Sequence, residues 1–341
     1  MKRDLLAFLS SPCCRAAMKF DTLKQFPALD SSELDEGLLS CAKCGRQYPF
    51  AGRVPELVAG PVGQKAAKTR DSFALEWQRY PQETRPEDRP VFLEECQLSP
   101  GDFQGKVVLD AGCGMGRYSV VALGLGAEVV AMDLSESLRG LAAKADRLPK
   151  LHVLKGDLLN PPLREKAFDI VYSHGVLHHT SDTRAAFDAV AKLVRPGGYL
   201  SVWLYGKAGR FSDFADNPIR EDRPWVRRHR RLAWLVVGLR HAISDFLRFF
   251  TTRLPLELVY AVCWPLAALG AVPFVKYLTF SVHPDFQVRL IENFDWLSPP
   301  YQFHHTKEEL ARWFREAGFD VIKILPHGLV PKPGILGRRR G

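Results

Sequence analysis

A glycine-rich turn preceded by an acid is the part of this sequence best suited to hold a ligand. In the run Val107-Val-Leu-Asp-Ala-Gly-Cys-Gly-Met-Gly-Arg-Tyr118, an apolar stretch ends near Asp110, and glycines follow at positions 112, 114 and 116. Glycine adopts backbone torsions that other residues avoid and lets a ligand come close to the main chain. We therefore expect this turn to bind a nucleoside-type cofactor where a helix begins.

Two more acids end the apolar runs that follow. Asp133 closes Val129-Val-Ala-Met-Asp133, at a distance of roughly 20 residues that suits hydrogen bonding to ribose hydroxyls. Asp157 closes Lys155-Gly156-Asp157 and could accept a hydrogen bond from the exocyclic amine of adenine. If these runs are parallel strands, the three acids share the carboxyl edge of one sheet, where such folds bind ligands.

The glycine spacing bears on which cofactor this is. A dinucleotide turn has the pattern G-x-G-x-x-G and holds a pyrophosphate at the helix N-terminus. Here the third glycine comes one residue early, and Asp110 would put negative charge near a phosphate. An acid at that point suits a cationic group, such as the amino group of an amino-acid moiety, so a nicotinamide dinucleotide is disfavoured.

Histidines after the fourth apolar run are candidate bases. His174, His178 and His179 lie within or just after Phe168-Asp-Ile-Val-Tyr-Ser-His174. Histidine titrates near neutrality and can take a proton from a hydroxyl, although the same side chains could simply shape a cofactor pocket. His304 and His305 precede a helix; they could touch a substrate, but solvated loop histidines are the simpler interpretation.

The elements that must position these residues follow from hydrophobic periodicity. Apolar runs alternate with helical patterns from 106 to 204, which predicts a parallel sheet with helices on both faces. The alternation stops at about 206. It resumes with a helix over 306–318, marked by an N-cap Thr306, a capping-box Glu309 and a final Gly318, and with the strand FDVIKIL. The core is therefore split by an insertion.

These motifs, taken in order, resemble the class I S-adenosylmethionine-dependent methyltransferases of type 11. The resemblance rests on the glycine turn, Asp133, Gly156-Asp157, the run from Phe168 to His179, and Arg195-Pro-Gly-Gly198. It covers about 105–205 well and 300–330 loosely. It implies an α/β fold with a doubly wound, seven-stranded, mostly parallel Rossmann-like sheet, and S-adenosyl-L-methionine as methyl donor.

The resemblance also implies roles for individual residues. Asp133 would bind the ribose, Asp157 would lie near the adenine, and the glycine turn would follow the methionine part. Methyl transfer from a sulfonium is an in-line displacement, so a base is needed only when the acceptor carries a proton; His178 and His179 are the candidates. The cofactor-binding set is Asp110, Gly112, Cys113, Gly114, Gly116, Asp133, Leu134, Asp157, Leu158 and Ser173.

The amino-terminal cysteines have the chemistry of a metal site. The chain has seven cysteines, and four of them, Cys13, Cys14, Cys41 and Cys44, fall in the first 60 residues. The odd count and the absence of a signal-peptide pattern indicate a reducing, cytoplasmic compartment, where clustered cysteines bind metal rather than form disulfides. The pattern resembles the small zinc-ribbon-like domains that accompany methyltransferases.

That resemblance implies a structural zinc ion held by two C-x-x-C turns. Cys41 and Cys44 form one such turn. In the other, Ser11 stands where the first thiolate is expected, so zinc would need Cys13 beside Cys14. The alternative is a ribbon that has lost its metal and kept its fold.

The insertion carries most of the chain's net positive charge. Residues 206–253 hold 11 Lys and Arg against 5 Asp and Glu, a net +6 out of +9 for the chain. Residues 258–275 are uncharged, but Pro265, Gly270 and Pro273 argue against one straight membrane-spanning helix. Three interpretations stay open: a helical cap over the substrate or in a dimer, a cap on an anionic membrane surface, and an RNA-binding cap.

We expect an ordinary globular enzyme that methylates a small or amphiphilic metabolite at oxygen, carbon or nitrogen. An RNA methyltransferase that uses the basic cap and ribbon is the first alternative, and a non-catalytic S-adenosylmethionine-binding scaffold or sensor is the second. The 341 residues, 46% hydrophobic and 25% charged, exclude a disordered or coiled-coil chain. The expected parts are the ribbon (1–60), a linker with an aromatic helix (61–105), the core (106–205), the cap (206–297), the end of the core (298–330) and a frayed basic tail (331–341).

Overall fold

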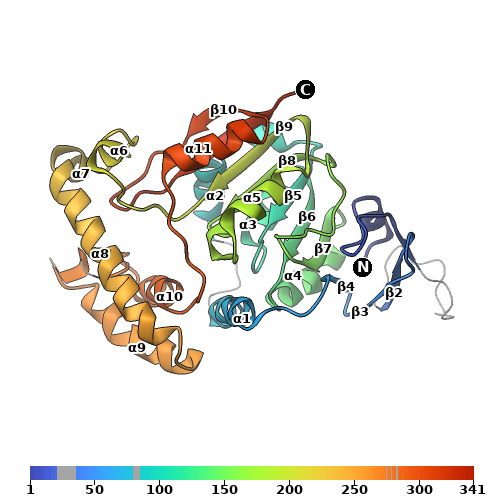
Figure 1. The fold of residues 1–341 in the computed structure, drawn as a ribbon, viewed down its shortest axis with the longest axis horizontal. Coiled ribbons are helices and arrows are strands. Elements are labelled where there is room, and N and C mark those ends of the chain that lie inside the picture. Colours follow the sequence, from blue (N-terminus) through green and yellow to red (C-terminus); the bar gives the residue numbers. More distant parts are fainter. Residues whose placement is uncertain (21–35, 80–84, 274, 278, 282) are drawn as a thin grey trace.

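Seven mostly parallel strands form the centre of the molecule, in the order β7-β6-β5-β8-β9-β11-β10 (Figure 1). The computed structural model describes residues 1–20, 36–79, 85–273, 275–277, 279–281 and 283–341. Strands β5 to β9 pair in parallel, and β11 runs antiparallel to β9 and β10. The doubly wound α/β sheet expected from the sequence is confirmed. The strands are β5 (Val107–Ala111), β6 (Glu128–Asp133), β7 (Leu151–Gly156), β8 (Phe168–His174), β9 (Val194–Trp203), β10 (Phe319–Ile324) and β11 (Gly334–Arg339).

Alternate residues of these strands enter two separate hydrophobic cores. Leu109 of β5 faces the core that includes Phe187 and Phe314, whereas its neighbour Val108 faces the core that includes Phe92. This alternation with a period of two is what places helices on both sides of a sheet. The first core is covered by α5 (Thr183–Ala191) and α11 (Lys307–Glu316), and the second by α2 (Asp88–Cys96), α3 (Arg117–Gly124) and α4 (Leu138–Lys144).

The cysteine-bearing region extends this sheet to eleven strands within the described residues, where we expect seven strands and a separate small domain. Its strand β4 pairs in parallel with β7, with Glu56 opposite Lys155 and Leu57 opposite Gly156. A pairing so distant along the chain leaves no local sequence pattern. The added strands are β1 (Met18–Phe20), β2 (Gly37–Cys41), β3 (Gln47–Ala51) and β4 (Val54–Leu57).

The carboxyl-terminal residues correct another expectation. We expect 331–341 to be a frayed tail, but β11 lies between β9 and β10 in the core sheet. Gly337 touches the helix below, since a Cβ there would come within 2.4 Å of the Phe314 ring. Arg339 donates to the backbone oxygens of Ala191 and Val194, at 3.1 and 2.6 Å. The arginines that look like a tail therefore bind carbonyls at the end of a strand.

The insertion is helical and packs beside the core at one end of the molecule (Figure 1). Helix α1 of the linker, which includes the predicted aromatic helix, contacts α10 of this cap. Among the residues that the structure describes, no helix combines the length and apolar character needed to cross a membrane. The helices are α1 (Gln64–Arg79), α6 (Phe211–Ala215), α7 (Pro224–Arg228), α8 (Arg230–Thr251), α9 (Leu256–Leu269) and α10 (Phe286–Leu297). The short 3-10 turns are η1 (Arg3–Ala7), η2 (Pro100–Phe103), η3 (Ala145–Arg147), η4 (Leu177–His179) and η5 (Val275–Tyr277).

Candidate functional site

The glycine turn between β5 and α3 has a backbone that only glycine accommodates. The φ angles of Gly112, Gly114 and Gly116 are 89°, 54° and 82°. A Cβ on Gly112 would come within 2.3 Å of Val176, and one on Gly114 within 2.9 Å of Trp77 Nε1. Both the torsions and the space therefore require glycine, and Trp77 of α1 lies over the turn.

Asp133, the last residue of β6, lies beside this turn. One of its carboxylate oxygens accepts from Gly114 N and the other from Ser135 N, both at 2.8 Å. A carboxylate offers about four lone-pair sites, so each oxygen can still accept a hydroxyl. Asp157, just past β7, accepts from Leu159 N at 2.9 Å with one oxygen. The two acids follow neighbouring parallel strands, as the sequence predicts.

The remaining predicted cofactor residues lie at or just below the same edge. Asp110 is buried; its Oδ2 accepts from Ser119 Oγ at 2.6 Å, and burial raises the pKa of Asp110 to about 7. The sequence predicts a cationic ligand at Asp110, whereas in the structure its carboxyl group hydrogen-bonds to a serine inside the fold. Ser173 Oγ donates to Ala111 O at 2.7 Å. Cys113 and Leu158 are buried and Leu134 is half-buried.

A second group of polar side chains lies where the core meets α1 and the cap. This group adjoins the glycine turn. Trp77, which lines the turn, follows Glu76 directly, and Val176, which also lines it, comes two positions before His178. Several polar atoms of the group have no hydrogen-bond partner in the described part of the chain. We call this group the polar cluster and define it as Glu76, His178, His179, Tyr205, His241, Arg248, Asp295 and His304.

His179 and Asp295 face each other across the polar cluster. His179 Nδ1 lies 2.9 Å from Tyr301 O, which can only accept, so Nδ1 carries the proton and Nε2 keeps a lone pair. Nε2 lies 3.6 Å from Asp295 Oδ1. Burial lowers the pKa of His179 to about 3, which keeps the ring neutral. A hydroxyl that came to lie beside these two atoms could donate its proton to either of them.

The carboxyl groups of the polar cluster are held partly protonated. Tyr205 Oη donates to Asp295 Oδ2, yet burial and the nearby Glu292 raise the pKa of Asp295 to about 7. Burial raises the pKa of Glu76 well above its usual value, and Asp295 adds to that shift. The Asp295 side chain is 17% exposed, but its Oδ1, which faces His179, is enclosed by the protein.

The structure sorts the predicted histidines into two sets. His178 joins the polar cluster, with its ring centroid 4.1 Å from that of Tyr205. His174 does not: its Nε2 lies 2.9 Å from Ser201 Oγ, and burial lowers its pKa to about 4. The interpretation of His304 and His305 as solvated loop residues is wrong. His304 packs 4.6 Å from the His241 ring, and His305 Nδ1 lies 3.2 Å from the Glu309 carboxylate.

Sequence reasoning missed Glu76, Tyr205 and Asp295. Glu76 stands between Leu75 and Trp77, and Asp295 between Phe294 and Trp296. An acid inside an apolar helical run was the one available signal, because burying a carboxyl group costs free energy unless the group is hydrogen-bonded or paired. The aromatic helix predicted over 72–80 offers Trp77 and Tyr80 either as a cover for the cofactor or as an ordinary packed face, and Tyr80 lies outside the described residues.

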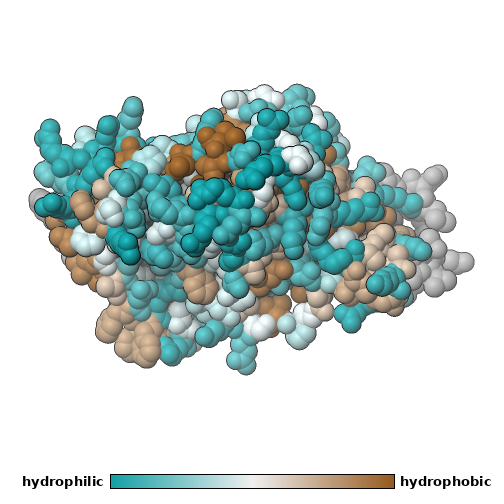
Figure 2. Space-filling model, turned by 45° about the horizontal axis from the view of Figure 1, so that its top comes forward, coloured by the Kyte–Doolittle hydropathy of each residue, from teal (hydrophilic) through white to brown (hydrophobic). Residues whose placement is uncertain are grey.

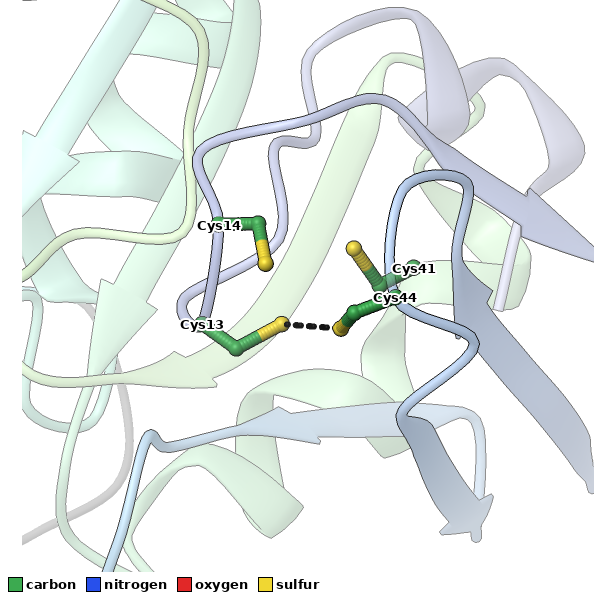
Figure 3. Close-up of side chains that lie close together, drawn as sticks. All are labelled: Cys13, Cys14, Cys41 and Cys44. Carbon is green, nitrogen blue, oxygen red and sulfur yellow. Dashed lines mark hydrogen bonds between the residues drawn. The ribbon is translucent and has the colours of Figure 1, made fainter.

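The four amino-terminal cysteines come together at the far end of the sheet (Figure 3). Their Sγ atoms all lie within 4.8 Å of one another, and those of Cys13 and Cys44 are 3.5 Å apart. Sulfurs bound tetrahedrally to zinc at about 2.3 Å would be roughly 3.8 Å apart, so the four thiols suit that ion. Ser11 accepts from Cys41 Sγ at 3.2 Å, and Cys13 stands at the fourth corner.

Comparisons with known proteins agree with the core geometry. Residues 109–202 match the family model described as a methyltransferase domain. The chain is 35% identical over 121 residues to a ubiquinone biosynthesis O-methyltransferase of Bordetella avium, covering 33% of this chain and 47% of that protein. It is 31% identical over 160 residues to a malonyl-[acyl-carrier protein] O-methyltransferase of Yersinia pestis, covering 47% of this chain and 50% of that protein. The chain thus spans about half the length of these curated relatives.

Among solved structures, the chain is similar to the 1,6-didemethyltoxoflavin-N1-methyltransferase of Burkholderia thailandensis. The TM-score is 0.43 and the identity 17%, over 88% of this chain and 98% of that one. The family match includes the glycine turn, Asp133, Asp157 and both predicted bases, and it ends before Tyr205. The cap and α1 lie outside it.

Proposed function

We propose, from the premise that residues 109–202 are a class I methyltransferase domain, that this protein transfers a methyl group from S-adenosylmethionine to a hydroxyl of a small or amphiphilic molecule. The observation that carries the proposal is the position of the His179–Asp295 pair next to the glycine turn. A cofactor held along the turn would bring its reactive end toward these two side chains.

The residues at the carboxyl edge fit this cofactor. Asp133 keeps acceptor capacity on both oxygens for the two ribose hydroxyls, and Asp157 has an oxygen for the adenine amine. The N–H groups of Gly112, Gly114 and Gly116 already have partners inside the fold, so the ammonium group of the amino-acid part would meet main-chain carbonyls of the turn. When bound, S-adenosylmethionine supplies an electrophilic methyl group on a sulfonium.

The polar cluster supports an acceptor that carries a proton. Asp295, whose pKa is about 7, would take the hydroxyl proton as the acceptor oxygen forms its bond to the methyl carbon and the carbon–sulfur bond breaks, and neutral His179, 3.6 Å away, would help to hold the acceptor in line. A carboxylate acceptor would need no base, and its negative charge would lie close to the carboxyl groups of Glu76 and Asp295. The two relatives described above are both named as O-methyltransferases, which favours oxygen over nitrogen.

Labelled methyl transfer tests this function. Protein, S-adenosylmethionine labelled in the methyl group and a cell extract are combined, and the products are separated into lipid, small-molecule, RNA and protein fractions. We expect label in the lipid or small-molecule fraction. Label confined to RNA would overturn the proposed acceptor, and the absence of any transfer would favour a non-catalytic binder.

Calorimetry tests the cofactor separately. Asp133→Ala should weaken S-adenosylmethionine binding by at least about 100-fold, because the two hydrogen bonds from ribose to a charged group contribute about 1.5–3 kcal/mol each. Glu165→Ala, at an exposed acid outside the site, is the matched control and should bind normally. If the wild type and both variants bind equally, Asp133 does not hold the cofactor.

We also propose that Cys13, Cys14, Cys41 and Cys44 hold a structural zinc ion. The support is their clustering at the scale of tetrahedral thiolate coordination. Metal analysis of purified protein should give one zinc per chain, and Cys41→Ser should abolish it, whereas Cys96→Ala, at a buried cysteine elsewhere, should not. Zinc retained by Cys41→Ser would contradict the assignment.

A further inference from the structure

The carboxyl-terminal half of helix α8 buries polar side chains and exposes apolar ones, whereas its first half buries Ala233 and Val237. The side chains that it buries include Arg240, Ser244 and Arg248, which are 4%, 0% and 8% exposed. On its outer side Phe246 and Phe249 are 66% and 60% exposed. A helix of a globular protein normally turns its apolar face inward, so this outer face is suited to an apolar environment.

Helix α9 continues the same character. Of the sixteen large hydrophobic residues exposed in the described part of the chain, eleven belong to α8, α9 or the turn after α9. Figure 2 shows apolar atoms over the end of the molecule that these helices form. We call these eleven residues the apolar cap face: Leu232, Leu235, Leu239, Phe246, Phe249, Phe250, Leu258, Val262, Trp264, Leu269 and Val272.

Exposed arginines flank this face. Arg227 and Arg228 end α7, Arg231 stands in the first turn of α8, and Arg253 follows the end of α8. The Arg253 guanidinium lies 4.1 Å from the centre of the Phe249 ring, so a basic and an apolar group are presented together.

The acids on the same helices offset only part of this charge. Asp245 and Glu257 are exposed, and Glu257 already pairs with Arg79 at 2.5 Å. The surface around the apolar cap face is therefore basic.

The charge pattern favours an anionic lipid surface over a second copy of the chain as the partner of the apolar cap face. A second copy of the chain, docked by a twofold axis, would bring the arginine-flanked faces of both copies together. An anionic lipid surface meets both needs: phosphates accept from the arginines, and the aromatic and leucine side chains enter the boundary between headgroups and acyl chains. No described helix is suited to cross the bilayer, so the helices would lie along it.

We propose that the apolar cap face docks on the surface of an anionic lipid bilayer, with α8 and α9 in the plane of the interface. The proposal does not depend on the methyl-transfer assignment, because it rests on the exposed residues of the cap alone. It would bring the polar cluster, on the inner side of α8, close to the membrane surface.

Vesicle flotation of the full chain tests this docking. Vesicles of phosphatidylcholine with phosphatidylglycerol are compared with vesicles of phosphatidylcholine alone. We expect the protein to float with the anionic vesicles, to bind neutral ones at least about tenfold more weakly, and to be released by high salt, since surface charge attraction is screened. Equal binding to both vesicle types, or to neither, would overturn the proposal.

Variants separate docking from misfolding. Phe246→Glu should reduce partition to anionic vesicles by roughly tenfold or more, because a buried phenylalanine contributes about 1.5–3 kcal/mol. Ile322→Glu, at a 48% exposed residue of β10, is the matched control and should float like the wild type. Replacing Arg227, Arg228 and Arg231 together by glutamine should weaken binding by up to about a hundredfold.

Two further measurements test whether the core of the variant is intact and whether the chain dimerises. S-adenosylmethionine affinity measured in the absence of lipid should be the same for Phe246→Glu and the wild type, which shows that the core is intact. Sedimentation should find the wild-type chain monomeric. A dimer that Phe246→Glu dissociates would instead assign the face to a second copy and overturn the lipid proposal.

Discussion

The cofactor edge and the polar cluster are adjacent, but they are held in place differently. At the cofactor edge, Asp133 is fixed by two backbone N–H groups, and the glycine turn is fixed by its own torsions. In the polar cluster, Asp295 is fixed by the Tyr205 side chain and faces His179 with an unpartnered oxygen. Main-chain anchoring suits an invariant cofactor, whereas a site made of side chains from several helices suits an acceptor that differs between enzymes.

The largest expected effect comes from the polar cluster. Asp295→Asn should lower turnover by roughly 10²- to 10⁴-fold, the usual contribution of a general base, and His179→Gln, which removes a positioning contact, should lower it less; S-adenosylmethionine affinity should change less than about twofold in both. Rates and calorimetry on the same samples check this. His283→Gln, at an exposed histidine of the cap, is the control. Comparable losses in turnover and in cofactor affinity would show that the two regions do not act separately.

Gly114→Ala probes the cofactor edge. The added Cβ would lie 2.9 Å from Trp77 Nε1 at a φ of 54°, so we expect a loss of stability of about 1–2 kcal/mol and S-adenosylmethionine binding weakened by about tenfold. Gly124→Ala in α3 meets no atom within 4 Å and should be neutral or stabilising by up to about 1 kcal/mol. Unchanged cofactor affinity in Gly114→Ala would break the distinction between the regions.

The pH dependence of stability distinguishes the two regions less strongly. The pKa of Asp295 rises to about 7 in the folded protein from its ordinary value of 3.8, so the folded state binds more protons between these values. Stability is therefore highest below about pH 4 as far as this group is concerned, and it falls as pH rises through 7.

Asp295→Asn should make that slope less negative by up to about 1.4 kcal/mol per pH unit. Urea unfolding of both proteins at pH 5 and pH 7 measures the change. A slope that stays the same in Asp295→Asn would assign the titration to another buried carboxyl group, such as Asp110, whose pKa is also raised to about 7.

The smallest effect concerns how α1 is joined to the cap. Ser72 Oγ and Ser298 Oγ share a buried hydrogen bond, so Ser72→Ala should destabilise the protein by about 1 kcal/mol and leave zinc content unchanged. Thermal melting and metal analysis check this. A loss near zero would mean that α1 is held by its apolar contacts alone.

The place of the glycine turn and of Asp133 and Asp157 along one edge of the sheet could be predicted from the sequence because the signals are local. Each of these features is encoded within a few consecutive residues: the three glycines of the turn, and the acids at the ends of two strands. The helix that begins after Thr306 is likewise recognisable from its capping box. The polar cluster draws on α1, η4, the segment after β9, α8, α10 and the loop before α11, and no short pattern encodes such an assembly. Strand β11 was missed because its buried residues, Ile335 and Leu336, are followed by a run of arginines.

The parallel pairing of β4 with β7 joins the cysteine region to the core of the sheet. Leu57 lies opposite Gly156, the residue before Asp157, so one hydrogen-bonded ladder runs from the cysteine region to the acid proposed to face adenine. Opening of β4 would leave β7 as a free edge. Metal and cofactor should therefore bind with positive cooperativity, each lowering the dissociation constant of the other by the same factor, as thermodynamic reciprocity demands.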